Sequence, residues 1–364
     1  AEILNAASRP LLLLGGGVVI GNASDLARQL AARADLPVAS TLMGLGAYPG
    51  RDSRHLGMLG MHGTVVANRA VTACDTLVAV GVRFDDRVTG KIAGFAPQAR
   101  IVHIDVDPTS VSKNVPVDTP IVGDARLILE DLLPRVAAPG AGARAAWWQQ
   151  IDAWKAGFPL RYGKGGLKPQ YVIEELARQT AGQETTIATD VGQHQMWTAL
   201  YYPFDRPRSL VTSGGLGTMG FGLPAGLGAQ LAAPGRLTVV VTGDGGFQMN
   251  IQELATAKRL DLPVKILLLD NGCLGMVRQL QEMFFEKRYV YTDLSDNPDF
   301  VAVAAAYGIP AERCERAEDV PGAIARLLAA PGPAFLDVRI DREENVVPMV
   351  PSGAAIDQAI GARD

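Results

Sequence analysis

The chain has 364 residues, of which 48% are hydrophobic and 20% charged, and its formal net charge is −4. This length is long for one domain and sufficient for two with a substantial buried core. The balanced charge gives no reason to expect a nucleic-acid partner, and no apolar run reaches the roughly 18 residues of a membrane helix. Three cysteines without a CxxC pair fit a reduced, cytoplasmic protein better than a disulfide scaffold.

Short apolar runs alternate with helical patterns through the first part of the chain. Strands are predicted at residues 10–14, 36–40, 76–80 and 101–105. A Gly-Gly-Gly turn follows the first strand, and an Ala/Leu-rich pattern predicts a helix over 23–34. This rhythm is typical of a parallel sheet wrapped by helices.

A stretch rich in Pro, Gly and Ala at 136–146 has no periodicity and predicts a linker. The tryptophan-rich segment at 147–158 is expected to pack that linker against a domain. Lys168-Pro169 then predicts a helix start, because proline fits the first helical turn.

The α/β rhythm resumes after the linker. Strands are predicted at residues 186–190, 237–242, 264–270 and 334–340, and a helix at 250–260. We therefore predict the α/β class, with two doubly wound domains built on mainly parallel sheets. The predicted segments are a first domain (1–140), a linker (141–168), a second domain (169–345) and a C-terminal tail (346–364).

Two polar residues follow neighbouring predicted strands of the second domain. Asp244 lies in Gly243-Asp244-Gly245, and Asn271 follows Asp270. Because α/β sheets bind ligands at the carboxyl ends of their strands, these side chains are expected to meet. A carboxylate, an amide oxygen and a backbone carbonyl suit Mg²⁺. Gly245 and Gly246 would let a diphosphate approach backbone N–H groups at a helix start.

An alternative interpretation of Gly-Asp-Gly is a tight turn in which Asp244 caps the following helix. Asn271 at the end of the next strand favours the metal site. Asp270 adds a second acidic residue beside it, and the sequence leaves open whether this residue places charge near the metal or forms a local hydrogen bond.

The Gly-Asp-Gly segment followed by an Asn-containing pair resembles thiamine-diphosphate-dependent enzymes. Longer segments resemble the acetohydroxyacid synthase (acetolactate synthase) family, and they are residues 189–197, 214–220, 275–279, 286–289 and 347–351. The resemblance implies that Asp244 and Asn271 ligate Mg²⁺ through side chains and Cys273 through its carbonyl. It implies diphosphate binding by residues at two glycine turns, namely Val191, Gly192, Gln193, His194, Gly245 and Gly246.

The same resemblance assigns roles around the reacting part of the cofactor. Met219 is implied to prop thiamine diphosphate in a bent form, and the carbonyl of Gly217 to accept from its 4′-amino group. Met219 as ordinary core filling is the alternative. Met276, Arg278 and Leu280 are implied to line substrate access. Relatives commonly have Trp where this chain has Leu280, so we expect weaker preference for 2-ketobutyrate as second substrate.

The first domain resembles the flavin-binding middle domain of this family. Arg83 and Arg87 suit a pyrophosphate, and Asp105 suits ribose hydroxyls; a surface ion-pair network is the alternative. The implied flavin-binding residues are Thr41, Leu42, Met61, His62, Gly63, Gly81, Arg83, Asp85, Arg87, Val88, Asp105, Val106 and Asp124. The flavin (FAD) is expected to be structural.

The implied activity is decarboxylation of pyruvate and carboligation to a second 2-ketoacid, giving acetolactate or acetohydroxybutyrate for branched-chain amino-acid biosynthesis. The family activates its cofactor with a glutamate in an amino-terminal domain that no segment here resembles. We therefore expect the chain to be inactive alone and to require that domain. Implied partners are 2-ketoacids, a second copy in a homodimer or tetramer, and a small regulatory subunit.

Two alternatives stay open at this point, and a third enzyme class is disfavoured. A non-catalytic fragment or module could be built from cofactor-binding halves, and another thiamine-diphosphate carboligase or decarboxylase is possible. A nicotinamide dehydrogenase would need Gly-x-Gly-x-x-Gly, and the spacing in residues 15–21 does not supply it.

Overall fold

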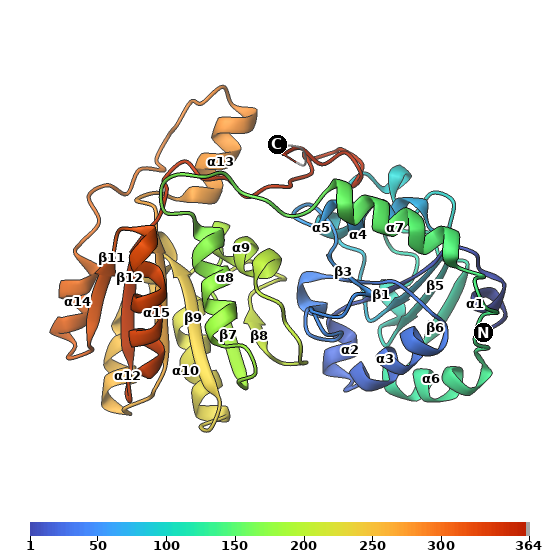
Figure 1. Ribbon diagram of the computed structural model, residues 1–364, viewed down its shortest axis with the longest axis horizontal. Helices are drawn as coiled ribbons and strands as arrows, with labels where there is room; N and C mark the ends of the chain where they lie inside the picture. The colour runs from blue at the N-terminus through green and yellow to red at the C-terminus, as the bar shows by residue number, and fades with distance from the viewer. Residues whose placement is uncertain (362–364) are drawn as a thin grey trace. The chain divides into compact units, whose positions relative to one another are not determined.

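The computed structural model describes residues 1–361 as two compact units (Figure 1). Unit 1 comprises Ala1–Arg161, Pro203–Arg208 and the described residues from 347 onward. Unit 2 comprises Tyr162–Tyr202 and Ser209–Val346. None of the helices in the described residues combines the length and apolarity that crossing a bilayer requires. The domain boundaries expected from the sequence stay predictions.

Unit 1 is built on a parallel six-stranded sheet with the order β3-β2-β1-β4-β5-β6. Its strands are β1 (Pro10–Leu14), β2 (Val38–Ser40), β3 (His55–Met58), β4 (Thr76–Val80), β5 (Arg100–Asp105) and β6 (Thr119–Val122). Its helices are α1 (Glu2–Ala6), α2 (Gly16–Ile20), α3 (Ser24–Arg33), α4 (Val65–Ala73), α5 (Asp86–Thr89), α6 (Ala125–Leu132) and α7 (Ala145–Gly157). Short 3₁₀ turns are η1 (Leu42–Gly44), η2 (Ile92–Gly94), η3 (Pro108–Ser110) and η4 (Leu133–Arg135).

Strand β1 shows why this sheet is buried on both faces. All five of its residues are buried. Leu11 and Leu13 belong to one apolar cluster, and Leu12 and Leu14 to another. Successive side chains of a strand point to opposite faces, so a continuous leucine run fills both layers.

Unit 2 repeats the architecture with the strand order β11-β12-β10-β9-β7-β8, again with parallel pairs. Its strands are β7 (Thr185–Thr189), β8 (Leu210–Thr212), β9 (Leu237–Gly243), β10 (Lys265–Asp270), β11 (Ala311–Cys314) and β12 (Ala334–Arg339). Its longer helices are α8 (Pro169–Gln179), α9 (Gln193–Tyr201), α10 (Gly222–Ala232), α13 (Gly275–Phe284) and α15 (Val320–Ala329). Shorter elements are α11 (Asp244–Met249), η5 (Ile251–Glu253), α12 (Leu254–Arg259), α14 (Phe300–Ala306) and η6 (Ala317–Asp319).

The predicted fold class, two doubly wound domains with parallel sheets, is confirmed. All eight predicted strands are present with ends within two residues, whereas β3, β6, β8 and β11 were not predicted. The helix expected at 250–260 is divided into η5 and α12. The tryptophan-rich segment forms α7, where the buried Trp147 donates from Nε1 to the Pro10 carbonyl at 3.0 Å, so it packs on unit 1 as predicted.

Candidate functional site

Three polar residues lie where neighbouring strands of unit 2 end. Asp190 directly follows β7, Asp244 follows β9, and Asn271 follows β10. These strands are adjacent and parallel in the order β10-β9-β7, so their carboxyl ends share one edge of the sheet. The chain leaves β7 toward β8 and leaves β9 toward β10, on opposite sides. That divergence places a crevice between β7 and β9, where open α/β sheets bind ligands.

A pocket that is open to solvent lies at this edge. The residues that line it are Val191, Gly192, Gln193, His194, Trp197, Met219, Gly243, Asp244, Gly245, Gly246, Leu269, Asn271, Cys273, Leu274, Gly275, Met276 and Val277. The structure therefore brings together all the residues predicted from the sequence to contact metal and diphosphate.

Asp244 is a buried carboxyl group in this pocket, only 2% exposed. Burial raises the pKa of Asp244 to about 7, and the negative charge of Asp270 contributes to the rise. Asn297 donates from Nδ2 to Asp244 Oδ2 at 2.8 Å. Gly243 precedes α11 and makes no side-chain capping bond. Asp244 lies in the first turn of α11, where its carboxyl group also accepts from the Gly245 N–H, so the helix-cap alternative for Asp244 stays open. A buried carboxylate of this kind is stabilised by a cation.

Asn271 presents a carboxamide to the same pocket. Its Nδ2 donates to Gln193 Oε1 at 3.2 Å, and its Oδ1 accepts from the Cys273 N–H at 3.2 Å. A carboxylate oxygen and an amide oxygen in one pocket are the ligands that Mg²⁺ prefers. Burial raises the pKa of the Cys273 thiol to about 11, so this side chain stays protonated and only its backbone suits a hard cation.

Asp270 forms a local ion pair. Its side chain is fully buried, and Oδ2 lies 2.8 Å from Nη1 of Arg339 on β12, while Oδ1 accepts from the Gly272 N–H at 2.9 Å. Burial raises the pKa of Asp270, and Arg339 opposes that rise. Of the two possibilities that the sequence left open, the local contact is therefore present, and the charge of Asp270 is also felt by Asp244.

A second part of the pocket suits an anion. Gly192 caps α9 with φ 152°, and the first N–H groups of this helix have no partner within the helix. His194 is 6% exposed, and its Nε2 is buried without a hydrogen-bond partner among the described residues. Burial lowers the pKa of His194 to about 4, so the imidazole is neutral in the ligand-free protein.

Glycine is required around this cradle by close contacts. A Cβ on Gly243 would lie 2.8 Å from His194 Nδ1, and one on Gly246 would lie 2.2 Å from Asp190 Oδ1. A side chain at either position would displace a polar group of the site. The glycines of this segment thus also keep His194 and Asp190 in place.

Sequence reasoning did not single out Asp190 as a site residue. Its Oδ1 accepts from the N–H groups of Val191 at 2.8 Å and Gly220 at 3.0 Å, and its Oδ2 accepts from Gly222 at 2.8 Å. These bonds tie the turn after β7 to the segment that contains Met219. The available signal was the one that identified Asp244, a polar residue directly after a buried strand.

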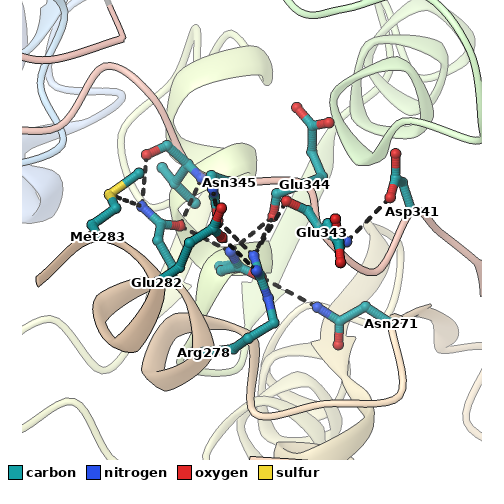
Figure 2. Close-up of polar contacts among 11 residues, drawn as sticks. Asn271, Arg278, Glu282, Met283, Asp341, Glu343, Glu344 and Asn345 are labelled. Atoms are coloured by element: carbon teal, nitrogen blue, oxygen red, sulfur yellow. Dashed lines mark hydrogen bonds and ion pairs between the residues drawn. The ribbon is translucent and has the colours of Figure 1, made fainter. Parts of the chain in front are cut away.

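The other predicted residues of unit 2 divide into two groups. Met219 and Met276 line the pocket, whereas its described lining does not include Gly217, Arg278 or Leu280. Gly217 is exposed with φ 67°. Arg278 is buried, and its guanidinium lies 2.6 Å from Glu282 Oε2 and 2.5 Å from Asn345 Oδ1 (Figure 2). The substrate-access role of Arg278 and Leu280 stays a prediction.

The residues predicted to bind flavin share one edge of the unit 1 sheet. Each is the last residue of a strand or lies in the segment that follows the carboxyl end of a strand. They are Thr41 and Leu42 after β2, Met61, His62 and Gly63 after β3, Gly81, Arg83, Asp85, Arg87 and Val88 after β4, Asp105 and Val106 at the end of β5, and Asp124 after β6. Asp85 caps α5, and Asp124 caps α6. Arg83 and Arg87 are exposed and form ion pairs with Asp85 at 3.2 Å and Asp86 at 3.5 Å.

Comparison with known families agrees with this geometry. Residues 190–338 match the family model described as "Thiamine pyrophosphate enzyme, C-terminal TPP binding domain", and residues 1–132 match "Thiamine pyrophosphate enzyme, central domain". The chain belongs to the thiamine pyrophosphate enzymes. The first of these models begins at Asp190 and covers the pocket residues that follow β7, β9 and β10.

Curated relatives within this family are similar along the whole chain. An acetolactate synthase large subunit of Haemophilus influenzae is 45% identical over 99% of this chain and 64% of the relative. An acetolactate synthase of Mycobacterium bovis is 44% identical over 100% and 60%. The isozyme 3 large subunit of Escherichia coli is 44% identical over 98% and 64%. The chain thus spans about three fifths of the length of the curated relatives it matches.

Proposed function

We propose that unit 2 binds thiamine diphosphate through Mg²⁺ and serves an acetolactate synthase-type active site. The activity would be decarboxylation of pyruvate and carboligation to a second 2-ketoacid, giving acetolactate or acetohydroxybutyrate. The observation that carries the proposal is the pocket in which the buried Asp244 and His194 meet the half-buried Asn271. The names of the relatives support the choice of reaction.

The residues of the pocket fit both Mg²⁺ and the diphosphate group of the cofactor. Asp244 and Asn271 would hold Mg²⁺ through their side-chain oxygens, and Cys273 through its carbonyl. The first turn of α9 and the segment at Gly245 and Gly246 would receive the diphosphate, because backbone N–H groups at a helix start favour anions. The cation would also stabilise the charged form of Asp244 that burial disfavours.

Bound thiamine diphosphate would supply the carbanion-stabilising chemistry that decarboxylation and carboligation need. The chain's own contribution is to bind and orient the cofactor. Met219 lines the pocket beside Gly245, where a Cβ would lie 3.6 Å from Met219 Cε, so an apolar group flanks the metal site. We assign Met219 to prop the cofactor and Gly217 to accept from its aminopyrimidine.

We further propose FAD as a structural cofactor of unit 1. The support is that the predicted contact residues share the carboxyl edge of one sheet. In addition, Nδ1 of His62 is buried without a partner among the described residues, so it could accept or donate a bond to a ligand. Calorimetric titration of FAD into the unaltered chain should give binding that is lost when Arg83 and Arg87 are both replaced with Met. Equal binding to the two proteins would contradict the assignment.

The assembly is also a proposal. Two of the relatives are named as large subunits, which supports a small regulatory subunit as partner of this chain as well. We propose a homodimer or tetramer that acts on 2-ketoacids. Light scattering with and without thiamine diphosphate, Mg²⁺ and FAD would measure the mass of the assembly directly.

Calorimetric titration of thiamine diphosphate, with and without Mg²⁺, tests the central proposal. We expect binding that depends on Mg²⁺ and is lost in Asn271→Ala. Binding that is equal without Mg²⁺, or equal in Asn271→Ala, would overturn the site. Acetolactate formation from pyruvate is then measured on this chain alone and after addition of the amino-terminal domain of a relative, because the relatives are longer than this chain.

A further inference from the structure

Two buried side-chain amides, those of Gln279 and Gln193, form a chain of hydrogen bonds that ends at the half-buried Asn271. Gln279 Nε2 donates to the Val346 carbonyl at 2.9 Å, and Gln279 Oε1 accepts from the Val346 N–H at 2.8 Å. Gln193 Nε2 donates to Gln279 Oε1 at 2.9 Å, and Gln193 Oε1 accepts from Asn271 Nδ2 at 3.2 Å. Figure 2 labels Asn271 and, in the segment that precedes Val346, Glu344 and Asn345.

The orientation of the first amide is fixed by the main chain. A side-chain amide can rotate by half a turn and exchange its donor and acceptor ends. A backbone N–H only donates and a backbone carbonyl only accepts. Because Gln279 contacts both groups of Val346, its oxygen must face the N–H and its nitrogen must face the carbonyl. In the reverse orientation, the Gln279 nitrogen would face the Val346 N–H and the Gln279 oxygen would face the Val346 carbonyl, so neither hydrogen bond could form.

The orientation of the Gln193 amide is fixed in the same way. Gln193 Nε2 also donates to the Glu344 carbonyl at 3.0 Å, so the end of Gln193 that meets Gln279 must be the nitrogen. Its oxygen then faces Asn271, where it can only accept. Gln193 is 3% exposed and Gln279 is fully buried, so water cannot readily replace either bond.

Only one orientation remains for Asn271. Its nitrogen is held by Gln193, so its oxygen is the end left for a cation, with one lone pair already accepting from the Cys273 N–H. Mg²⁺ is bound by oxygen and not by an amide nitrogen. We propose that Gln279 is a positioning residue, which acts through Gln193 to direct the Asn271 carboxamide oxygen toward the cation. This inference rests on the proposed metal site.

Two further features are built around this amide chain. A Cβ on Gly275 would lie 2.0 Å from Gln193 Oε1 and 2.6 Å from Asn271 Nδ2, so the bond between these amides requires glycine at the start of α13. The segment 344–346, whose backbone groups fix the orientation of the two glutamines, is itself held by two side chains. Arg278 binds Asn345 at 2.5 Å, and Lys168 binds the Glu344 carboxylate at 2.5 Å.

The test measures Mg²⁺ affinity by calorimetry at saturating thiamine diphosphate. Gln279→Met keeps the volume and removes both ends of the amide, and we expect it to weaken Mg²⁺ binding about tenfold, the size typical of groups that orient metal ligands. Gln230→Met is the matched control. Gln230 is a buried glutamine on α10 that donates to the carbonyls of Pro234 and Arg236, near the opposite end of β9.

A symmetric ligand separates positioning from a general structural effect. In an Asn271→Asp background both side-chain ends are oxygens, so their orientation no longer matters. We expect Gln279→Met to cause no further loss of Mg²⁺ affinity in that background. Equal loss in both backgrounds, or equal loss in Gln230→Met, would overturn the positioning role.

A second variant protects the test against misfolding of Gln279→Met. Gly275→Ala should displace the bond between Gln193 and Asn271, so it should weaken Mg²⁺ binding in the otherwise unaltered chain but not in the Asn271→Asp background. If the unaltered chain shows no Mg²⁺-dependent binding, the proposed function fails. If it binds and neither variant changes the affinity, only the positioning inference fails.

Discussion

The two units share one architecture but end their central strands in different ways. In unit 1 the chain diverges after β1 and β4, and in unit 2 after β7 and β9. The turns after β1 and β4 close on each other through backbone bonds from Gly15 N–H to the Val80 carbonyl at 2.9 Å and from Gly17 N–H to the Gly81 carbonyl at 3.1 Å. The turns after β7 and β9 instead line a pocket.

This difference shows what a parallel sheet does and does not determine. The strand order places a crevice at each divergence. Whether it is open depends on the residues that follow the strands. Gly15 and Gly81 let two turns of unit 1 touch, whereas His194 and Asp244 leave polar groups facing a space. Substitutions at matching positions of the two units can therefore test the comparison.

The largest expected effect comes from the carboxylate of the pocket. Asp244→Asn should weaken Mg²⁺-dependent binding of thiamine diphosphate by at least about 100-fold, because a ligand contributes more than the outer groups that typically cost 10–100-fold. Calorimetry measures this. The same variant should raise the unfolding temperature of the metal-free chain, since it removes a buried charge that faces Asp270.

The matched control for that variant is Asp124→Asn in unit 1. Asp124 also follows a strand of its sheet, but its carboxylate caps α6. We expect thiamine diphosphate binding to be unchanged and the chain to lose a little stability. Equal effects of the two variants on binding would contradict the distinction between the units.

Glycine substitutions should separate packing from binding. A Cβ on Gly15 would lie 2.1 Å from the Gly81 carbonyl oxygen, and backbone cannot readily give way. Gly15→Ala should therefore destabilise unit 1 by about 3 kcal/mol, the upper range for overpacking, without changing thiamine diphosphate affinity. Gly246→Ala should lower that affinity, because its Cβ would displace Asp190. Hydrogen exchange followed by peptide mass spectrometry locates the destabilised unit, and calorimetry measures the affinity.

Removing an ion pair should cost more stability in unit 2, where one partner is buried, than in unit 1, where both partners are exposed. Arg339→Met leaves the buried Asp270 without its cation and should destabilise unit 2 by about 2 kcal/mol, less than a fully buried pair because Arg339 is partly exposed. Asp270→Asn added to this variant should recover most of the loss. Arg87→Met removes an exposed pair of unit 1 and should cost less than about 0.5 kcal/mol. Urea unfolding gives all three values.

A further comparison concerns the response of unit 1 to mild acid. Burial lowers the pKa of His55 and of His62 to about 4, against 6.5 in the unfolded chain. Between these values the unfolded state binds more protons, so the stability of unit 1 falls as the pH decreases from 6.5 toward 4. At pH 5.5 we expect a loss of about 1 kcal/mol per histidine relative to pH 7.

Histidine variants identify the source of that loss. Burial also lowers the pKa of His103 on β5. Replacing His55 and His62 with Asn should therefore reduce the acid sensitivity of unit 1 peptides in hydrogen exchange, and replacing His103 as well should remove most of it. A histidine whose folded pKa were raised would give the opposite slope, with stability greatest at low pH. Acid sensitivity that persists in the triple variant would show that other groups control it.

The sequence was sufficient for the features that depend on local pattern. Buried parallel strands are apolar runs, and polar residues at their ends pointed to Asp244 and Asn271. Strands β3, β6, β8 and β11 were not predicted because they have only three or four residues and a mixed burial pattern, as in β6, where half-buried and exposed positions alternate without a buried face. Short strands of this kind are defined by their neighbours in the sheet.

The rest of the site depends on contacts between distant segments. Asn297 reaches Asp244 from 53 positions away, and Gln279 reaches Val346 from 67 positions away. No local pattern marks a glutamine as one that bonds backbone groups of another segment. The pairing of Asp270 with Arg339 is likewise set by the register of β10 and β12, which the sequence alone does not give.

The two hydrogen bonds between Val346 and Gln279 also couple metal binding to the Val346 backbone. Val346 is the last residue of unit 2 before the chain continues into residues counted with unit 1. Coupling free energies are reciprocal, so a segment that helps to orient a metal ligand is in turn protected when the metal binds. On the proposed positioning role of Gln279, exchange of the Val346 N–H with solvent should slow when Mg²⁺ and thiamine diphosphate bind.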